Sequence, residues 1–247
     1  MKDNYILTAE SVTAGHPDKL CDTIADNVLD ACLKEDPNAR VACEVLATAG
    51  KILVAGELRT TANPDVEAIV RQVVRNAGYD CNYHVEVRLH TQSPDIAGAV
   101  DGDTLGAGDQ GIMYGYACWE TVELLPAPVV LANRITSLLT TCREENLISG
   151  IGPDGKAQVS VQYAFGVPER VDTIVISCQH DADKGPDELR EELRRLVIAR
   201  ACHDVRIDEQ TKIFINPSGR FVLGGFEADT GLTGRKLMVD TYGGLVP

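Results

Sequence analysis

Apolar residues recur at helical spacing in some parts of the chain and at strand spacing in others. After Pro17, a residue suited to the first turn of a helix, the apolar stripe Leu20, Ile24 and Val28 marks one buried face. Farther along, residues 84–90 alternate between apolar and polar types, as a half-buried strand does. The first part of the chain thus predicts, in order, a helix that begins at Pro17, strands at 41–48 and 51–58 joined by a hairpin turn, a helix from Pro64 to Gly78, and a strand at 84–90.

The same order of elements recurs in the second part of the chain. The pattern there predicts a helix at 128–145, strands at 157–164 and 171–178, a helix at 186–201 and a strand at 211–215. Two units of helix, strand, strand, helix, strand indicate an internal duplication, although their residues show no obvious identity. Hairpin strands with helices gathered on one face are typical of an α+β protein rather than of a doubly wound parallel sheet.

The connection between the two units has almost no periodicity. Residues 91–111 read TQSPDIAGAVDGDTLGAGDQG, with five glycines and four aspartates. A loop of this length in a compact protein is usually either a linker or a lid over an active site. Repeated Gly and Asp favour a segment that closes on a ligand, and a plain linker is the alternative.

Composition and charge narrow the classes of function. The chain has 247 residues, 44% of them hydrophobic and 24% charged, as in an ordinary globular protein. The formal net charge of −14 argues against general nucleic-acid binding, and no apolar run is long enough for a membrane span or a signal peptide. The eight cysteines are scattered without metal-site spacing, which predicts reduced thiols and a cytoplasmic protein.

The first candidate site is the segment ESVTAGHPDK at 10–19. His16 and Asp18 flank Pro17 at a predicted helix start, where free backbone N–H groups and the helix dipole favour a bound anion. Asp18 is also a suitable carboxylate ligand for Mg²⁺. The alternative is that the two residues only cap the helix.

Two further segments combine glycines with charge. GAGDQG at 106–111 would let the backbone approach a ligand, but it matches neither a Walker loop nor a dinucleotide fingerprint. In an acidic chain, a bound phosphate needs cations that are concentrated in one place. The candidate cations are Lys156, Arg220, Arg235 and Lys236. Taken singly, each is explained equally well as part of a basic surface turn.

Taken together, these segments resemble the signature segments of S-adenosylmethionine synthetases (methionine adenosyltransferases). The likeness rests on GHPDK at 15–19, QSPDI at 92–96, GAGDQG at 106–111, NPSGRF at 216–221, GLTGRK at 231–236 and VDTYGG at 239–244. It covers essentially the whole chain. It implies a fold of three similar α+β domains related by pseudo-threefold symmetry, of which two are present here and most of the C-terminal domain is missing. The implied boundaries are 1–100 for the N-terminal domain, 101–225 for the central domain and 226–247 for the start of the third, with a mobile lid at about 92–108.

The resemblance also implies the reaction and its partners. Family members bind ATP and L-methionine, and the thioether sulfur displaces triphosphate from C5′ of the ribose. The triphosphate is then cleaved to pyrophosphate and phosphate. The implied cofactors are Mg²⁺ and K⁺, and the implied assembly is a homodimer or homotetramer with active sites between subunits. A separate chain that supplies the rest of the third domain is a further expected partner.

Individual roles follow from motif position in the resemblance. The implied catalytic residues are His16, Lys156, Arg235 and Lys236, and the implied ATP contacts are these four with Asp154, Arg220, Phe221 and Asp229. The implied methionine contacts are Glu57, Gln92, Asp109 and Asp229, and the implied ion ligands are Asp18 for Mg²⁺ and Glu44 for K⁺.

Three hypotheses about the chain remain open at this stage. The first is an active methionine adenosyltransferase, either intrinsically short or completed by a separate polypeptide. The second is a non-catalytic subunit that binds nucleotide and pairs with a complete enzyme, and the third is a truncation product. Because the chain keeps every matched motif residue within its length, we favour the enzyme.

Overall fold

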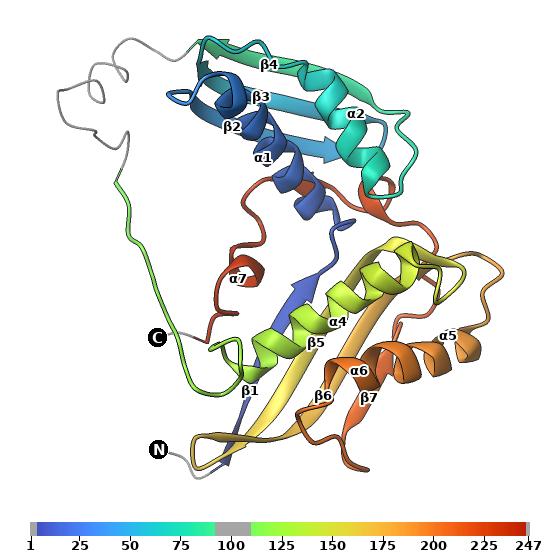
Figure 1. Ribbon diagram of the computed structural model, residues 1–247. Coiled ribbons are helices and arrows are strands. Elements are labelled where there is room, and N and C mark those ends of the chain that lie inside the picture. The colour runs from blue at the N-terminus through green and yellow to red at the C-terminus, as the bar shows by residue number, and fades with distance from the viewer. Residues whose placement is uncertain (1–3, 92–109, 246–247) are drawn as a thin grey trace.

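The computed structural model describes residues 4–91 and 110–245. Two four-stranded sheets lie in two parts of the molecule, and helices cover one face of each sheet (Figure 1). This arrangement confirms the α+β class. Within the described residues, no helix is both long enough and apolar enough to cross a membrane.

The first sheet has the strand order β4-β3-β2-β8. Strands β2 (Arg40–Thr48) and β3 (Lys51–Arg59) pair antiparallel in the expected hairpin. The chain then passes through helix α2 (Val66–Asn76) to β4 (His84–Thr91), which pairs parallel with β3. Helix α2 and helix α1 (Pro17–Glu35) pack on this sheet. The core between them includes Leu20, Ile24, Val28, Val45, Ile52, Val54 and Val70.

The second sheet has the order β1-β5-β6-β7 and repeats this plan. Strands β5 (Ile151–Ala164) and β6 (Val167–His180) form an antiparallel hairpin, and β7 (Lys212–Ile215) pairs parallel with β6. Helix α4 (Ala127–Glu144) precedes the hairpin. The helical crossover from β6 to β7 consists of α5 (Pro186–Leu193), a π-helical turn (Arg194–Ile198) and α6 (Ala199–Ala201).

The shared order of pairing confirms the internal duplication. Each unit has a helix, a hairpin, and a helical crossover to a strand parallel with the second strand of that hairpin. Each hairpin is then extended by a strand from far away in the sequence. Strand β1 (Asn4–Val12) pairs antiparallel with β5, and the two-residue strand β8 (Gly231–Leu232) pairs antiparallel with β2. The sequence pattern predicts neither of these edge strands.

Several predicted boundaries are wrong. Helix α2 begins at Val66 instead of Pro64, because Asp65 is its N-cap and accepts a hydrogen bond from the backbone N of Ala68 at 3.0 Å. The strands of the second hairpin extend beyond 157–164 and 171–178, to Ile151 and His180. The domain boundaries stay predictions.

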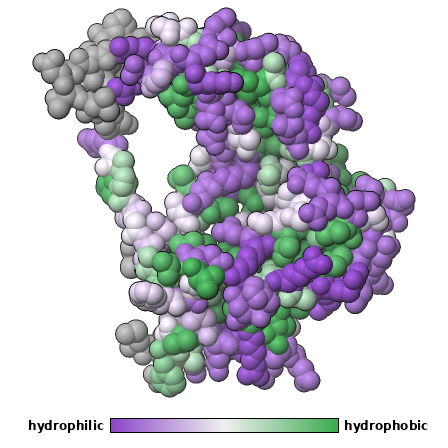
Figure 2. Space-filling view, in the orientation of Figure 1, coloured by the Kyte–Doolittle hydropathy of each residue, from purple (hydrophilic) through white to green (hydrophobic). Residues whose placement is uncertain are grey.

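The surface of the described chain is mostly polar in one view, with apolar side chains in smaller patches (Figure 2). The large apolar side chains with the highest exposure among the described residues are Trp119, Val122 and Met113, which precede α4. Beyond β8, the short helix α7 (Leu237–Asp240) lies close to β1. The last described residues thus pack beside the first strand.

Candidate functional site

His16 is the N-cap residue of α1 and lies where the two units meet. Its side chain is 2% exposed, and its Nδ1 accepts a hydrogen bond from the backbone N of Asp18 at 3.1 Å. Because Nδ1 is an acceptor, the proton of the neutral ring resides on Nε2. Burial, followed by the charges of Lys156 and Lys236, lowers the pKa of His16 to about 4. At neutral pH the ring is therefore uncharged and can donate a hydrogen bond from Nε2.

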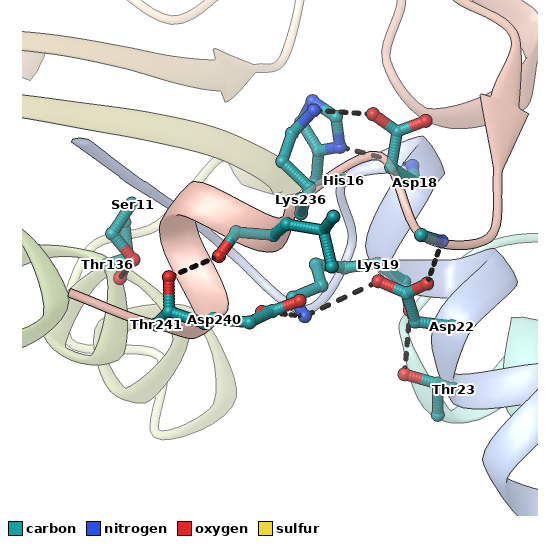
Figure 3. A network of polar contacts seen from close by, with 12 residues as sticks. Ser11, His16, Asp18, Lys19, Asp22, Thr23, Thr136, Lys236, Asp240 and Thr241 are labelled. Carbon is teal, nitrogen blue, oxygen red and sulfur yellow. Dashed lines mark hydrogen bonds and ion pairs between the residues drawn. The ribbon is translucent and has the colours of Figure 1, made fainter. Parts of the chain in front are cut away.

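Asp18 joins the start of α1 to the C-terminal segment (Figure 3). Its Oδ2 lies 2.5 Å from Nζ of Lys236, and its Oδ1 accepts a hydrogen bond from the backbone N of Leu232 at 3.0 Å. Arg235 Nε is 3.8 Å from the same Oδ1. Burial alone would raise the pKa of Asp18, but the bonds from Lys236 and Leu232 outweigh it and hold that pKa below its ordinary value. Asp18 is therefore an ionised carboxylate with both oxygens engaged.

Two more contacts hold the C-terminal segment against α1. Asp22 Oδ1 accepts a hydrogen bond from the backbone N of Gly234 at 2.9 Å, and Lys19 pairs with Asp240 (Figure 3). The segment that carries the predicted cations Arg235 and Lys236 is thus fixed to the helix that begins with the predicted histidine. The two lie more than two hundred positions apart in the sequence.

The PDGK segment of β5 lies directly against the residues before His16. Thr13 donates from its backbone N to Gly155 O at 2.9 Å and from its hydroxyl to Pro153 O at 2.7 Å. Gly15 packs so closely that a Cβ atom there would lie 2.4 Å from the carbonyl oxygen of Pro153. Only glycine permits this approach of the two backbones.

Asp154 is a buried carboxylate of which only one oxygen accepts a hydrogen bond from the described residues. Its Oδ2 accepts a hydrogen bond from the backbone N of Gly225 at 3.0 Å, while its Oδ1 has no hydrogen-bond partner among the described residues. The side chain is 5% exposed, and burial raises its pKa. A buried acceptor without a partner is costly, and a ligand hydroxyl would satisfy it.

Lys156 and Asp229 complete this cluster. After burial, the charge of Lys156 is the next cause of the low pKa of His16, and Asp229 acts on the same pKa in the opposite sense. Both residues are exposed, so their charged groups are open to a ligand. We name the set the junction cluster: His16, Asp18, Asp154, Lys156, Asp229, Arg235 and Lys236.

Arg220 and Phe221 lie in the loop after β7, beside the end of β6. The backbone of Phe221 is tied to His180, through a bond from His180 N to Phe221 O at 2.8 Å and a bond from Phe221 N to His180 Nε2 at 3.2 Å. Arg220 lines a cavity of about 360 Å³ together with Lys184 and Arg190 of the α5 region. Within the described ranges, no hydrogen bond or ion pair joins Arg220 or Phe221 to the junction cluster.

The remaining predicted residues lie on the first sheet or outside the described chain. Glu57 of β3 lies 3.2 Å from Nε2 of His90 on β4. Glu44 of β2 is exposed and accepts a hydrogen bond from the Thr233 hydroxyl. The predicted methionine contacts Gln92 and Asp109 lie outside the described residues, as does the predicted lid at 92–108.

Among the described residues, the predicted ion ligands Asp18 and Glu44 each stand apart from any group of acidic side chains that could share an ion. No group of three or more His, Cys, Asp or Glu side chains in 4–91 and 110–245 is arranged to hold a metal ion. Asp18 contributes a single carboxylate, whose oxygens already bond Lys236 and the Leu232 amide. Glu44 is likewise a single carboxylate, on an exposed strand position.

Sequence reasoning missed two residues that touch the site. Tyr79 donates from its hydroxyl to Gly15 O at 2.9 Å, and Gly225 bonds Asp154. Tyr79 belongs to no charged or glycine-rich motif, so no local signal marks it. Gly225 follows NPSGRFVLG, and its glycine-rich neighbourhood was the available signal.

Comparison of the chain with known proteins identifies its family. Three family models match successive parts of the chain: S-adenosylmethionine synthetase N-terminal domain over 4–102, central domain over 104–221 and C-terminal domain over 223–247. Proteins named S-adenosylmethionine synthase match nearly the whole chain. The one from Finegoldia magna is 46% identical over 261 residues, with 98% of this chain and 67% of the relative covered. The one from Desulfosudis oleivorans is 48% identical over 258 residues, with coverage of 99% and 66%.

A third relative, from a Nitratiruptor species, is 46% identical over 257 residues and matches 100% of this chain and 67% of its own length. The chain thus spans about two thirds of the length of the curated relatives that it matches. These matches confirm the resemblance in its main point: the chain belongs to the S-adenosylmethionine synthetase family.

Proposed function

We propose that this chain binds ATP and L-methionine and forms S-adenosylmethionine. The observation that carries the proposal is the junction cluster, which brings a buried neutral histidine, three cations and a buried carboxylate acceptor together from three distant segments. The names of the relatives support a transferase of this kind over a non-catalytic subunit.

The reaction requires a strong electrostatic contribution from the protein. The methionine sulfur forms a bond to C5′ with its lone pair, and the bond from C5′ to the triphosphate oxygen breaks with its electron pair on that oxygen. Negative charge therefore grows on the leaving group. Lys156, Arg235 and Lys236 supply positive charge beside His16, where it can stabilise the transition state. Of these, Lys236 is also paired with Asp18, which fixes its position before substrate arrives.

His16 and Asp154 suit two different parts of the nucleotide. His16 is uncharged at neutral pH and carries its proton on Nε2, so the neutral ring can donate a hydrogen bond from Nε2–H to the departing oxygen. Asp154 Oδ1 is a buried acceptor that a ribose hydroxyl would satisfy. In this arrangement one unit holds the sugar and the start of α1 faces the bond that breaks.

Mg²⁺ at Asp18 and K⁺ at Glu44 remain part of the proposal as family expectations. With Asp18 bonded to Lys236, Mg²⁺ would need most of its ligands from the substrate or from another chain. We therefore assign no step of the reaction to either ion. The methionine contacts Glu57, Gln92, Asp109 and Asp229, the ATP contacts Arg220 and Phe221, the cytoplasmic location, and a homodimer or homotetramer likewise stay predictions.

The test is a product assay on the purified chain. We would incubate it with ATP, L-methionine, Mg²⁺ and K⁺, and measure S-adenosylmethionine, pyrophosphate and phosphate separately. Equal amounts of all three products are the expected result. A chain that binds ATP but forms no product, even after a polypeptide with the rest of the C-terminal domain is added, would contradict the proposed activity.

A further inference from the structure

Tyr79 reaches from the first unit into the place where the two units meet. It comes directly after the turn that ends α2, and its backbone N donates to Val74 O at 3.2 Å. From this anchored position the hydroxyl donates to the carbonyl oxygen of Gly15 at 2.9 Å. That carbonyl belongs to the peptide group that leads into His16. The orientation of this peptide group is therefore fixed by a side chain from another part of the fold.

The ring of Tyr79 makes a second contact, with the segment that holds Asp154. A Cβ atom on Gly225 would lie 2.7 Å from Cζ of the ring, so the ring rests directly on the Gly225 backbone. Gly225 has φ +63°, and its N–H donates to Asp154 Oδ2 at 3.0 Å. One side chain thus touches the backbone before His16 and the backbone that bonds Asp154.

The hydroxyl of Tyr79 is a permanent donor in this position. Burial, and after it the nearby charge of Asp154, raises the pKa of Tyr79 well above its ordinary value. The hydroxyl therefore keeps its proton at neutral pH. The bond to Gly15 O is present there without any titration, as a fixed spacer requires.

We propose that Tyr79 is a positioning residue, which sets the distance and orientation of His16 relative to Asp154 through its contacts with Gly15 and Gly225. The catalytic part of the inference rests on the proposed function, because it assumes that His16 and Asp154 act on the same nucleotide. The geometric part, that Tyr79 fixes the surroundings of His16, holds without that function.

The test compares Tyr79→Phe with a matched control. Phe keeps the ring on Gly225 and removes only the donor to Gly15 O. Tyr83→Phe removes a hydroxyl from another tyrosine of the same core, one whose ring packs against Phe226 and whose hydroxyl bonds Glu227 instead of Gly15. We expect Tyr79→Phe to lower kcat about tenfold while KM for ATP changes less than about twofold, because misplacement of a catalytic group affects the transition state more than binding. Tyr83→Phe should leave both constants close to those of the parent.

A second readout separates this inference from the proposed activity. The proton–carbon NMR cross-peak of the His16 ring, recorded at pH 7 on the chain without nucleotide, reports its surroundings directly. Tyr79→Phe should move this cross-peak and Tyr83→Phe should not, whether or not the parent forms product. If the parent forms no product while the cross-peak moves as expected, the proposed function fails and the positioning role of Tyr79 stands.

A rescue variant guards against a trivial loss of folding. 4-Aminophenylalanine at position 79 restores a donor in the same place and should return both kcat and the His16 cross-peak toward the parent values. The proposal is overturned if the His16 cross-peak is the same in the parent and Tyr79→Phe. It is equally overturned if Tyr79→Phe and Tyr83→Phe shift kcat and the cross-peak alike, or if the aminophenylalanine chain behaves like the Phe chain.

Discussion

Replacement of Asp18 by asparagine should loosen the C-terminal segment from helix α1. The carboxylate is 3% exposed and lies 2.5 Å from the Lys236 ammonium, whose side chain is 16% exposed. Asparagine keeps an oxygen for the Leu232 amide but loses the charge that holds Lys236. A hydrogen bond between charged groups contributes about 1.5–3 kcal/mol, and the half-exposed Arg235 at 3.8 Å adds little. We therefore expect the free energy of unfolding to fall by about 2 kcal/mol.

Urea unfolding with a matched control measures this loss. Asp26→Asn removes the same charge from an exposed position of the same helix, and its effect should stay within about 0.5 kcal/mol. With a slope of about 2 kcal/mol per M, the midpoint of Asp18→Asn should fall by about 1 M. Trypsin should also cut Asp18→Asn faster after Arg235 and Lys236. Equal midpoints and equal cleavage rates for the two variants would refute the view that Asp18 fastens this segment.

Three further predictions concern the site and the helix ends. Gly15→Ala places a Cβ 2.4 Å from the Pro153 carbonyl oxygen, so it should lower the free energy of unfolding by about 1–3 kcal/mol and weaken ATP binding in calorimetry. The control Gly115→Ala, whose Cβ would have nothing within 4 Å, should change neither quantity. Similar stability for both variants would contradict the close approach of Gly15 to Pro153. Hydrogen bonds to the Asp36 carboxylate, first the one from the Thr61 backbone N–H, hold the pKa of Asp36 below its ordinary value of 3.8. The ionised carboxylate therefore stabilises the fold above pH 3.8, and this stabilisation fades as the pH falls through the lower pKa of the folded state. Asp36→Asn should therefore flatten the fall of Tm with acid in this range, and an unchanged slope would exclude the effect. His16→Ala should lower the rate of S-adenosylmethionine formation far more than ATP affinity, and equal losses in both would remove the assigned role.

The helices and hairpins could be predicted from the sequence because their signals are local. The stripe Leu20, Ile24 and Val28 predicts α1, and it is buried as expected. Strand β1 lacks such a signal, because its partner β5 lies about 150 positions away and pairing alone defines it. Strand β8 has only two residues, and neither periodicity nor propensity can mark so short an element.

For the site, the identity of the residues could be predicted from the sequence, but their electrostatic state could not. Residue types and motif order indicate the family, so His16, Asp154 and Lys236 could be named from the sequence. Their electrostatic state could not be predicted, because the low pKa of His16 depends first on burial and then on charges from distant segments. The prediction of Asp18 as an ion ligand used residue type alone, and nothing in the sequence shows that Lys236 would be its partner.

The position of the junction cluster follows from how the duplicated fold closes its open sheet edges. Each hairpin leaves the edge of its first strand without a neighbour, and an unpaired edge is a liability that proteins cover. Here β1 covers the edge of β5 in the second sheet, and β8 covers the edge of β2 in the first sheet. The N-terminal strand thus joins the second sheet, and the C-terminal segment joins the first. The chain leaves β1 at Val12 and reaches GHPDK at 15–19, and it leaves β8 at Leu232 and reaches Arg235 and Lys236. Each motif follows its edge strand within a few residues. The strand pairing that covers the two sheet edges therefore also brings His16 and Asp18 beside the cations from the other end of the chain.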